Sequence, residues 1–214
     1  MLELWGRKNA YNVQKTTWLL AELGLDYIHH DVGSAEGDLD SQSFLALNPH
    51  ARIPVLKDKG EIIWESNSIV RYLAAIYSRG DMWAEDALKR SQAERWMDWE
   101  LCKLQPDFID LFWGFYRTPA ATRDDAFIDK ARKRCEEHFE QLDRQLENQD
   151  YLAGDGLTIA DIACAVCVYR YFNMGFKVQQ PPNVTRWYQR LSARHAYAST
   201  IMLPFDELRG RLEY

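Results

Sequence analysis

Residues 53–73 read IPVLKDKGEIIWESNSIVRYL, and this stretch decides the fold class. Two β-prone runs, at 53–57 and 61–64, flank a short polar turn that ends in Gly60, which predicts a hairpin. The pattern then becomes helical, and we expect a helix over residues 66–77. Two paired strands followed at once by a helix indicate a sheet that is covered by helices on at least one face.

The chain before this stretch alternates between strand-prone and helix-prone segments. Residues 2–5 and 27–32 read as strands, residues 12–23 as a helix, and residues 41–47 as a short helix. The full order is strand, helix, strand, helix, strand, strand, helix. This order predicts an α/β domain with a mixed sheet over residues 1–80.

The chain after residue 81 has few strand signals. Pro106 is expected to bend the first of its helices, and Thr158 with Asp161 forms a capping-box pattern at the start of the third. The second part is therefore predicted to be an all-α domain over residues 86–214. Its expected helices cover residues 86–116, 124–148, 158–172 and 184–194.

Composition excludes several classes of protein. The 214 residues are 47% hydrophobic and 27% charged, which excludes a disordered chain. A net charge of −6, from 26 basic and 32 acidic residues, argues against a nucleic-acid surface. The longest uncharged apolar stretch, residues 162–169, is far shorter than the roughly 18 residues of a membrane span. We therefore expect neither a nucleic-acid nor a membrane partner.

The first eight residues, MLELWGRK, contain no apolar signal-peptide segment, so a cytoplasmic protein is expected. The four cysteines are then expected to be reduced thiols. Cys164 and Cys167 form a CxxC pattern, but it lies inside a predicted helix of the second domain. Dithiol chemistry of the thioredoxin type would require it at the first helix of the α/β domain, so we interpret both as structural cysteines.

Three segments of the first domain could bind parts of one small peptide. The loop before residue 12 leads into a helix N-terminus, which favours an anion such as a thiolate, although Asn12 could simply cap the helix. Pro54 opens a predicted strand, and a cis Ile53–Pro54 bond would turn the Ile53 backbone outward toward an extended peptide. An ordinary proline at a strand start is the alternative.

The third segment is Glu65-Ser66 at the start of the predicted helix 66–77. A carboxylate followed by a hydroxyl suits an amino-acid head group, because Glu65 can hold the ammonium while Ser66 and the helix amides hold the carboxylate. Alone, the pair is also what an ordinary helix start looks like. Together the three segments offer sites for a thiol, a peptide backbone and an α-amino acid.

This combination resembles the glutathione S-transferase superfamily over essentially the whole chain. The resemblance implies a thioredoxin-like N-terminal domain that binds glutathione, an all-α C-terminal domain and a homodimer. It is carried by the segments NPHARIPVL at residues 48–56, ESNSIVRYL at 65–73 and LTIAD at 157–161. The segments NVQK at residues 12–15 and RWMDW at 95–99 are similar to bacterial theta-like and nu-like members.

The resemblance also assigns roles by position. Glu65 and Ser66 should bind the γ-glutamyl group of glutathione, and Ile53, before Pro54, the cysteinyl backbone. Arg52 and His50 should lie near the glycyl carboxylate. Asn12 should face the glutathione sulfur. Site residues predicted in this way are Asn12, His50, Arg52, Ile53, Pro54, Glu65 and Ser66.

The thiol-activating side chains of most relatives are missing. Serine-type members carry their hydroxyl where this chain has Ala10, and tyrosine-type members where it has Trp5-Gly6. The loop has no cysteine either. The catalytic prediction is therefore Asn12, whose amide can donate to a thiolate, with Tyr11 as a further candidate should its side chain turn inward.

Aromatic residues of the second domain are expected to contact an apolar electrophile, since in relatives this helix lines that site. The predicted residues are Phe112, Trp113 and Tyr116. No metal site is expected, because no histidine has Cys or carboxylate partners at ligand spacing. Glutathione is the predicted co-substrate.

The predicted function is a glutathione transferase that couples glutathione to an apolar electrophile, in the manner of detoxification enzymes. Three alternatives stay open. One is a glutathione-dependent disulfide reductase, another a carrier of hydrophobic ligands without catalysis. The third is a protein-interaction module that keeps the fold and has lost the chemistry.

Overall fold

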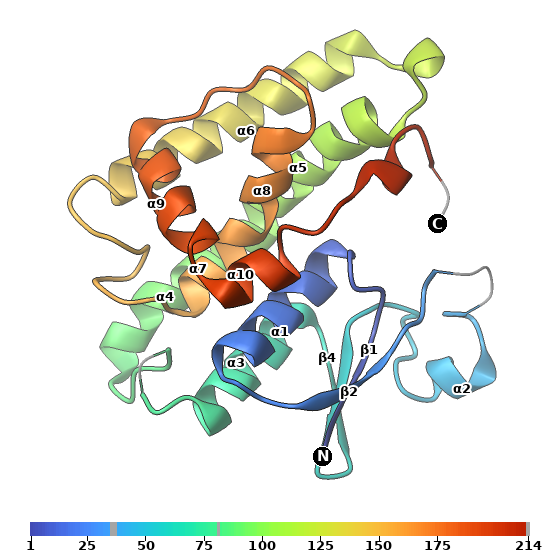
Figure 1. Cartoon of the computed structure of the whole chain (residues 1–214), viewed down its shortest axis with the longest axis vertical. Helices are drawn as coiled ribbons and strands as arrows, with labels where there is room; N and C mark the ends of the chain where they lie inside the picture. Colours follow the sequence, from blue (N-terminus) through green and yellow to red (C-terminus); the bar gives the residue numbers. More distant parts are fainter. Residues whose placement is uncertain (35–37, 81, 213–214) are drawn as a thin grey trace.

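The computed structural model describes residues 1–34, 38–80 and 82–212. A four-stranded sheet lies at one end of the molecule and a helical domain at the other (Figure 1). The strand order is β2-β1-β3-β4, with β1 parallel to β2 and the other neighbours antiparallel. The strands are β1 (Leu2–Trp5), β2 (Tyr27–His30), β3 (Val55–Asp58) and β4 (Glu61–Trp64). The predicted fold class, an α/β domain followed by helices, is confirmed.

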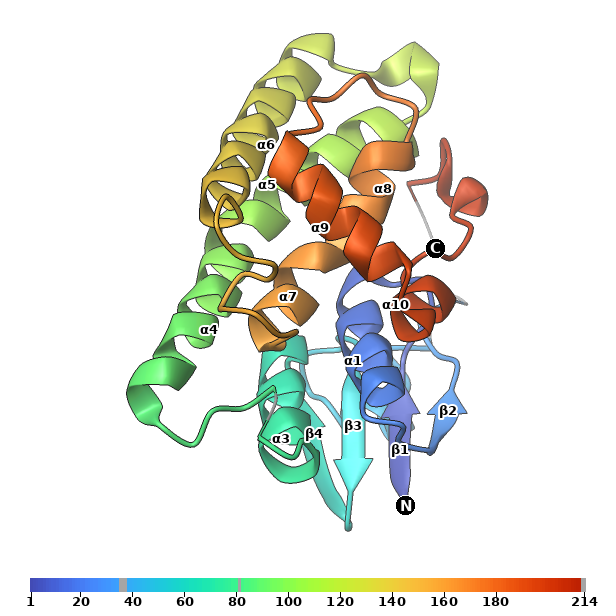
Figure 2. The same cartoon turned by 60° about the vertical axis from the view of Figure 1, so that its left-hand side comes forward.

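Helices α1 (Tyr11–Glu22) and α3 (Ser66–Tyr77) pack side by side between the sheet and the helical domain (Figure 2). The short helix α2 (Gln42–Leu45) lies apart from them, beyond the sheet (Figure 1). Helix α1 is buried on nearly every face over its first ten residues. A helix that is buried all round has packing partners on both sides, and the partners here are the sheet and helices α7 (Ile159–Cys164) and α10 (His195–Thr200).

The hairpin of β3 and β4 turns at Lys59 and Gly60, which both have positive φ, at 51° and 92°. Two residues with positive φ make the turn whose twist matches antiparallel strands. The prediction began the first strand at residue 53, but β3 begins at Val55 because Ile53 and Pro54 belong to the preceding loop. The sheet otherwise follows the predicted order.

Asp58, at the end of β3, is buried and accepts hydrogen bonds from Tyr72 Oη at 2.7 Å and Tyr77 Oη at 2.6 Å. Burial alone would raise the pKa of Asp58. The two hydroxyls of α3 outweigh burial and hold the pKa below its ordinary value. This carboxylate therefore fastens α3 to the hairpin.

We expect Tyr77→Phe to lower the free energy of unfolding by about 1.5–3 kcal/mol at pH 7, the usual value of a hydrogen bond to a charged group. Because the folded-state pKa of Asp58 is lowered, this stabilisation is present above about pH 4 and is lost as the pH falls through the folded-state pKa. Urea unfolding of the wild type and the variant at pH 7 and pH 3 measures it. Tyr27→Phe on β2 is the control, and an equal deficit at both pH values would contradict the account.

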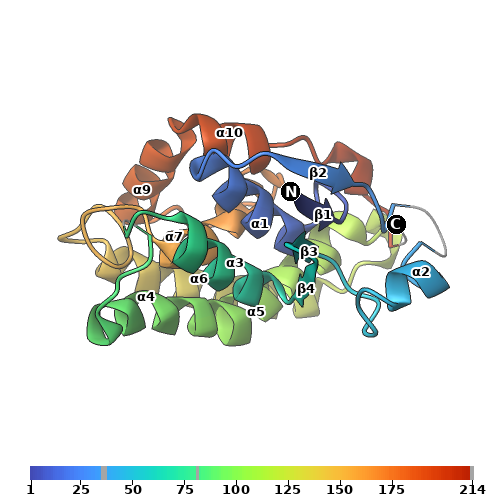
Figure 3. The same ribbon diagram turned by 90° about the horizontal axis from the view of Figure 1, so that it is seen from below.

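The first helical segment of the second domain is long and interrupted. It consists of α4 (Ala87–Trp99), the π-helix η1 (Glu100–Leu104), α5 (Gln105–Leu111) and the π-helix η2 (Phe112–Arg117). From below, α4 and α5 follow one line along the molecule (Figure 3). The helix expected over residues 86–116 is thus present, but two π-helical segments interrupt it, whereas the sequence predicted a bend at Pro106. The first ends just before Pro106, which has no N–H to donate.

The remaining helices enclose one core with this segment. Between α7 and α8 a short 3-10 turn interrupts the helix expected over residues 158–172. The short helix α10 was not predicted. The further elements are η3 (Ala120–Thr122), α6 (Asp125–Gln145), η4 (Ala165–Cys167), α8 (Val168–Asn173), α9 (Pro182–Ser192) and η5 (Asp206–Leu208). Within the described part of the chain, no helix combines the length and apolarity that crossing a membrane requires.

The predicted capping box at the start of α7 is confirmed. Thr158 Oγ1 accepts from the backbone of Ala160, and the Asp161 carboxylate accepts from the Thr158 N–H at 2.9 Å. The same carboxylate also accepts from Leu152 N at 3.0 Å and Trp187 Nε1 at 3.0 Å. Asp161 therefore holds the loop before α7 and helix α9 as well as its own helix.

Candidate functional site

The N-termini of α1 and α3 meet at Asn12 and Ser66. Ser66 Oγ donates a hydrogen bond to Asn12 Oδ1 at 3.2 Å, although 54 positions separate the two residues. The N-cap of α1 is Ala10, which makes no side-chain capping bond, so the interpretation of Asn12 as a cap is wrong. Within the described residues the Asn12 amide nitrogen has no acceptor, and it is available to donate to a ligand.

Glu65 precedes Ser66 with a φ of 69°, in the left-handed region. This conformation costs a residue that is not glycine roughly 1–3 kcal/mol and is found chiefly at functional sites. The Glu65 side chain is exposed and makes no capping bond to α3. The Glu65 carboxylate is therefore not bonded to the first amides of α3. It can pair with a cation that lies next to these amides.

The Ile53–Pro54 peptide bond is cis, which is the first of the two alternatives that the sequence left open. Gly6, at the end of β1, lets the two sides of the site approach closely. A Cβ on Gly6 would lie 2.5 Å from a Val13 methyl carbon and 3.3 Å from Ile53 Cβ. The absence of a side chain at Gly6 thus brings Ile53 against the first turn of α1.

The loop before Pro54 is organised by Asn48. This buried residue accepts a hydrogen bond from His50 N at 3.0 Å and donates one to Arg52 O at 2.9 Å. The side chains of His50 and Arg52 are exposed, and the His50 ring stands edge-on to Trp64 at 5.1 Å. Among the described hydrogen bonds and ring contacts, neither side chain has Asn12 or Ser66 as a partner, so the structure does not bring His50 or Arg52 into the contact between those two residues.

Tyr11 does not join Asn12. Its hydroxyl donates to Glu100 Oε1 at 2.8 Å, within the interface between the two domains. Neighbouring helix positions point about 100° apart, so Asn12 points toward Ser66 while Tyr11 points toward the second domain. Burial, and after it the Glu100 carboxylate, raises the pKa of Tyr11 well above its ordinary value. A role for Tyr11 in activating a thiol would require this hydrogen bond to break.

The three residues predicted to contact an electrophile are not brought together. Phe112 and Tyr116 are 3% and 1% exposed and stack on each other at 5.1 Å. The C-terminal segment covers them, since Phe205 packs against both rings and Gly210 N donates to Tyr116 O. Trp113 lies on another face of the helix, beneath the Arg117 guanidinium. Phe112 and Tyr116 are four positions apart and therefore share one face of the helix. This face belongs to the core, because the C-terminal segment covers it.

The tail that covers these rings is also tied to the loop before α1. Asn9 Nδ2 donates to Glu207 Oε1, and Arg170 donates to Asn9 O and, at 3.0 Å, to Gln14 Oε1. Gln14 in turn donates to Thr200 O at 2.9 Å. These residues could not be predicted from the sequence, because contacts across about 160 to 200 positions leave no local signal.

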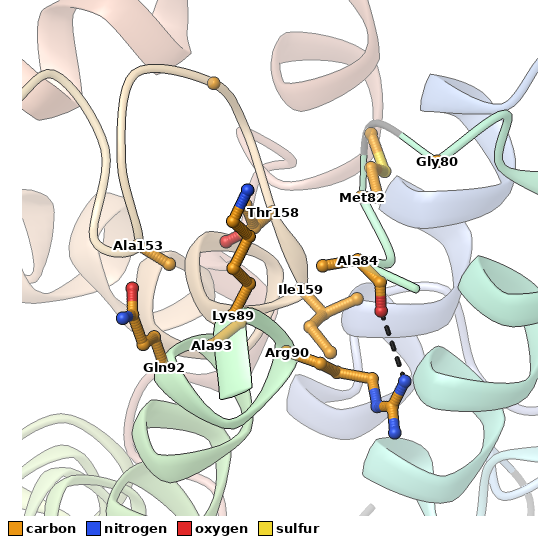
Figure 4. A pocket seen from close by; sticks show the side chains of 11 residues that line it. Gly80, Met82, Ala84, Lys89, Arg90, Gln92, Ala93, Ala153, Thr158 and Ile159 are labelled. Atoms are coloured by element: carbon orange, nitrogen blue, oxygen red, sulfur yellow. Dashed lines mark hydrogen bonds between the residues drawn. The ribbon is translucent and has the colours of Figure 1, made fainter. Parts of the chain in front are cut away.

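Three cavities in the described part of the structure are lined by residues other than Asn12 and Ser66. One of about 390 Å³ opens between α4 and the loop before α7, where the Arg90 guanidinium donates to Ala84 O (Figure 4). A second, of about 420 Å³, is bordered by Trp113 and Phe127. A third, of about 380 Å³, lies between Trp5 and α2. The linings of these three cavities include none of the glutathione-site residues predicted from the sequence, which are Asn12, His50, Arg52, Ile53, Pro54, Glu65 and Ser66.

Among the hydrogen bonds of the described residues, none joins a cysteine of this chain to Asn12 or Ser66. Cys135, Cys164 and Cys167 are buried, and burial raises the pKa of each thiol. Cys102 is exposed on η1. In the described residues, no group of three or more His, Cys, Asp and Glu side chains could hold a metal ion. A reactive thiol at Asn12 must therefore come with a ligand.

Comparison with known proteins agrees with this geometry. Profiles described as "Glutathione S-transferase, N-terminal domain" and "Glutathione S-transferase, C-terminal domain" match residues 12–76 and 104–195. The chain is 40% identical over 206 residues to Glutathione S-transferase GstB of Escherichia coli (strain K12), across 95% of this chain and 99% of GstB.

Solved structures give the same result. The theta class glutathione S-transferase from the citrus canker pathogen Xanthomonas axonopodis pv. citri, with glutathione bound, superposes with a TM-score of 0.90. It is 38% identical, over 95% of this chain and 98% of that one. Its apo form superposes with a TM-score of 0.84 at 34% identity, over 95% and 97% of the two chains. The chain belongs to the glutathione S-transferase family.

Proposed function

We propose that this protein couples glutathione to an apolar electrophile, using a glutathione thiolate that is stabilised by Asn12 and the N-terminus of α1. The observation that carries the proposal is the contact between Asn12 and Ser66, which joins the N-termini of α1 and α3. It is supported by membership of the glutathione S-transferase family and by the similar Xanthomonas structure, which has glutathione bound.

Glutathione would lie across the N-termini of α1 and α3, with its charged ends on opposite sides of the contact between Asn12 and Ser66. The Glu65 carboxylate would hold the γ-glutamyl ammonium, while Ser66 and the first amides of α3 would hold the neighbouring carboxylate. The Ile53 backbone, before the cis bond to Pro54, would pair with the cysteinyl backbone. The glycyl carboxylate would lie near the exposed side chains of His50 and Arg52, where the Arg52 guanidinium would offer it a positive charge.

Thiolate formation follows from the electrostatics of the helix terminus. An amide N–H that donates to a charged sulfur contributes about 1.5–3 kcal/mol, and the helix dipole adds up to about 2 kcal/mol. At about 1.36 kcal/mol per pKa unit, these terms lower a thiol pKa of about 8.5 by one to three units. Asn12 cannot accept the proton, which leaves to water.

The thiolate then attacks the electrophilic carbon. A sulfur–carbon bond forms, and the bond to the leaving group breaks with its electron pair on that group. Asn12 and the α1 amides act before this step, by holding the sulfur as an anion at neutral pH.

We expect Glu65→Gln to raise the KM for glutathione about tenfold to a hundredfold with a smaller change in kcat. The substitution removes a charge that acts on the ammonium and not on the sulfur. Initial rates at varied glutathione measure it. Glu61→Gln, on the exposed end of β4, is the matched control. Equal KM values for Glu65→Gln and the wild type would contradict the placement of the ammonium.

A glutathione-dependent disulfide reductase is the second candidate, favoured by the lack of a hydroxyl or thiol side chain at Ala10 beside Asn12. In that reaction two glutathione thiols are oxidised to their disulfide while the substrate disulfide is reduced to two thiols. Parallel assays with a chloronitrobenzene-type electrophile and a small mixed disulfide separate the two. Thioether formation alone supports the transferase, and disulfide turnover alone the reductase. Binding of glutathione without either reaction indicates a carrier or an interaction module.

We further propose a cytoplasmic homodimer that acts in detoxification. Apolar side chains that are exposed on the α3–α4 side support the dimer, since Ile76 is 53% and Leu101 is 42% exposed. Light scattering of the purified protein measures the mass directly. A mass that stays at 25.1 kDa across micromolar concentrations would contradict a stable dimer.

A further inference from the structure

A buried ion pair joins the two domains directly behind the proposed glutathione site. Lys15 Nζ lies 2.7 Å from Glu100 Oε2, and both side chains are 0% exposed. The other carboxylate oxygen of Glu100 accepts from Tyr11 Oη at 2.8 Å. Each oxygen of Glu100 therefore fixes one residue in the first two turns of α1.

The ion pair is part of a larger cluster, which consists of Tyr11, Lys15, Asn67, Glu100 and Gln105. This cluster extends to α3 and to the long helix of the second domain. Lys15 Nζ also lies 3.0 Å from Gln105 Oε1 and 3.5 Å from Asn67 Oδ1. Asn67 Nδ2 donates to Met97 O at 3.1 Å. Lys15, Asn67 and Glu100 thus connect the N-terminal parts of α1 and α3 to one point on the helical domain.

The π-helix η1 explains how this helix supplies two partners to one lysine. Glu100 is the first residue of η1, and the backbone N–H of Gln105 bonds to Glu100 O, five positions back. In an α-helix, residues five apart point about 140° away from each other, whereas the wider turn places them one above the other. Both side chains therefore reach Lys15. Wide turns of this kind occur frequently at functional sites.

Two members of the cluster are sequence neighbours of the two residues that form the proposed site. Tyr11 and Lys15 lie four positions apart on one face of α1, and Asn12 is the neighbour of Tyr11 on the next face. On α3, Asn67 follows Ser66 in the same way. The two residues whose contact forms the proposed site are thus each one position from a member of the cluster.

Stability alone is a weak reason for such a pair. Burying two charges costs about as much as their attraction returns, and apolar residues of similar volume are often equally stable or more so. The pair is better explained by the geometry that it imposes. A charged pair with further hydrogen bonds allows only one relative arrangement of the helices, whereas helices that pack through apolar side chains can shift against each other. Cys164 and Cys167 are the other titratable groups that face Glu100 and Lys15, and both stay neutral because burial raises the pKa of each thiol.

We propose that Glu100 is a positioning residue, which fixes the rotation of α1 against α3 so that the Asn12 amide stays aimed at the glutathione sulfur. This inference rests on the proposed function of the Asn12 site. Glu100 itself touches neither Asn12 nor Ser66 in the described structure and acts through Tyr11, Lys15 and Asn67.

The direction of change in the thiol pKa separates positioning from simple electrostatics. Removing the Glu100 charge leaves the Lys15 cation in α1 unbalanced, and a cation alone would favour a thiolate and lower the pKa of the bound thiol. Loss of positioning instead withdraws the Asn12 donor and raises that pKa. The two roles therefore predict shifts of opposite sign.

The test is Glu100→Gln, which keeps the size of the side chain. We expect kcat at pH 7 to fall about tenfold to a hundredfold, as for a small misplacement of a catalytic group. The KM for glutathione should stay within about threefold, and the pKa of the bound thiol should rise. Glu136→Gln, which removes another ion-paired carboxylate with low exposure in the helical domain, is the matched control and should match the wild type. An unchanged or lowered thiol pKa with intact kcat overturns the proposal.

The double variant Lys15→Met/Glu100→Gln covers the case in which a lone buried cation prevents folding. It removes both charges, so we expect a folded protein whose kcat stays low and whose thiol pKa stays raised. A double variant with the kcat of the wild type overturns the proposal. A wild type that fails to bind glutathione in calorimetry would instead refute the glutathione site, a result distinct from any difference between variants.

Discussion

Asn12→Ala is expected to lower kcat for glutathione conjugation by about a hundredfold to a thousandfold, the usual cost of removing one donor from an anion-stabilising site. The KM for glutathione should change by a few-fold at most. The reason is that the Asn12 amide meets the sulfur, while the charged ends of the tripeptide are held elsewhere. The loss should therefore appear in the chemical step.

Steady-state rates with a chloronitrobenzene-type electrophile at saturating glutathione measure this effect. Asn173→Ala, on the exposed end of α8, is the matched control and should behave as the wild type. Tyr11→Phe is the second comparison, because it removes the bond to Glu100 Oε1 while the chain keeps the amide donor of Asn12. Unchanged turnover in Asn12→Ala, with a large loss in Tyr11→Phe, would reverse the assignment of the catalytic residue.

Asp161→Ala is expected to have the largest effect on stability, about 3–5 kcal/mol. The Asp161 carboxylate is fully buried and accepts hydrogen bonds from Leu152, Thr158 and Trp187. Alanine would leave those donors buried without partners, and each such donor costs about 1–3 kcal/mol. Since a domain is typically stable by about 5–15 kcal/mol, the variant should lose a large share of its stability.

Urea unfolding at pH 7 measures the loss, with Asp155→Ala as the control because Asp155 is exposed in the same loop. A deficit below about 1 kcal/mol for Asp161→Ala would contradict the account, since a single hydrogen bond contributes about that much.

The pH dependence of this site gives a further readout. Burial raises the pKa of Asp161 to about 6, against the pull of its four donors. Because the folded-state pKa lies above that of the unfolded chain, the contribution of this group to stability is fully present below about pH 4 and is lost as the pH rises through about 6. The difference in unfolding free energy between the wild type and Asp161→Asn should therefore be more favourable to the wild type at pH 5 than at pH 8.

Local signals predicted most of the fold. The alternation in residues 2–5 and 53–64, the breaks at turns and the pairing of Thr158 with Asp161 all act over a few positions. The sheet, the hairpin and the capping box therefore appeared where the sequence placed them. The start of β3 shifted by two residues because Ile53 and Pro54 belong to a loop whose shape depends on Asn48, which the local pattern does not show.

Long-range contacts were beyond the reach of such signals. Tyr11 looked like a second catalytic candidate until its partner Glu100, 89 positions away, was in place. Phe112 and Tyr116 carried the right chemistry for an apolar site, but the C-terminal segment packs over them. In both cases tertiary packing decided the role of a residue that its neighbours in sequence left open.

The central claim is that this protein holds glutathione as a thiolate at Asn12 and the N-terminus of α1. The most direct test is a pH titration of the near-ultraviolet thiolate absorbance of glutathione bound to the wild type, with free glutathione and the Asn12→Ala complex alongside. We predict a midpoint one to three units below that of the free thiol, at about 8.5, and a return toward the free value in the variant. The claim would be contradicted if the thiol of glutathione bound to the wild type titrated with the same midpoint as free glutathione.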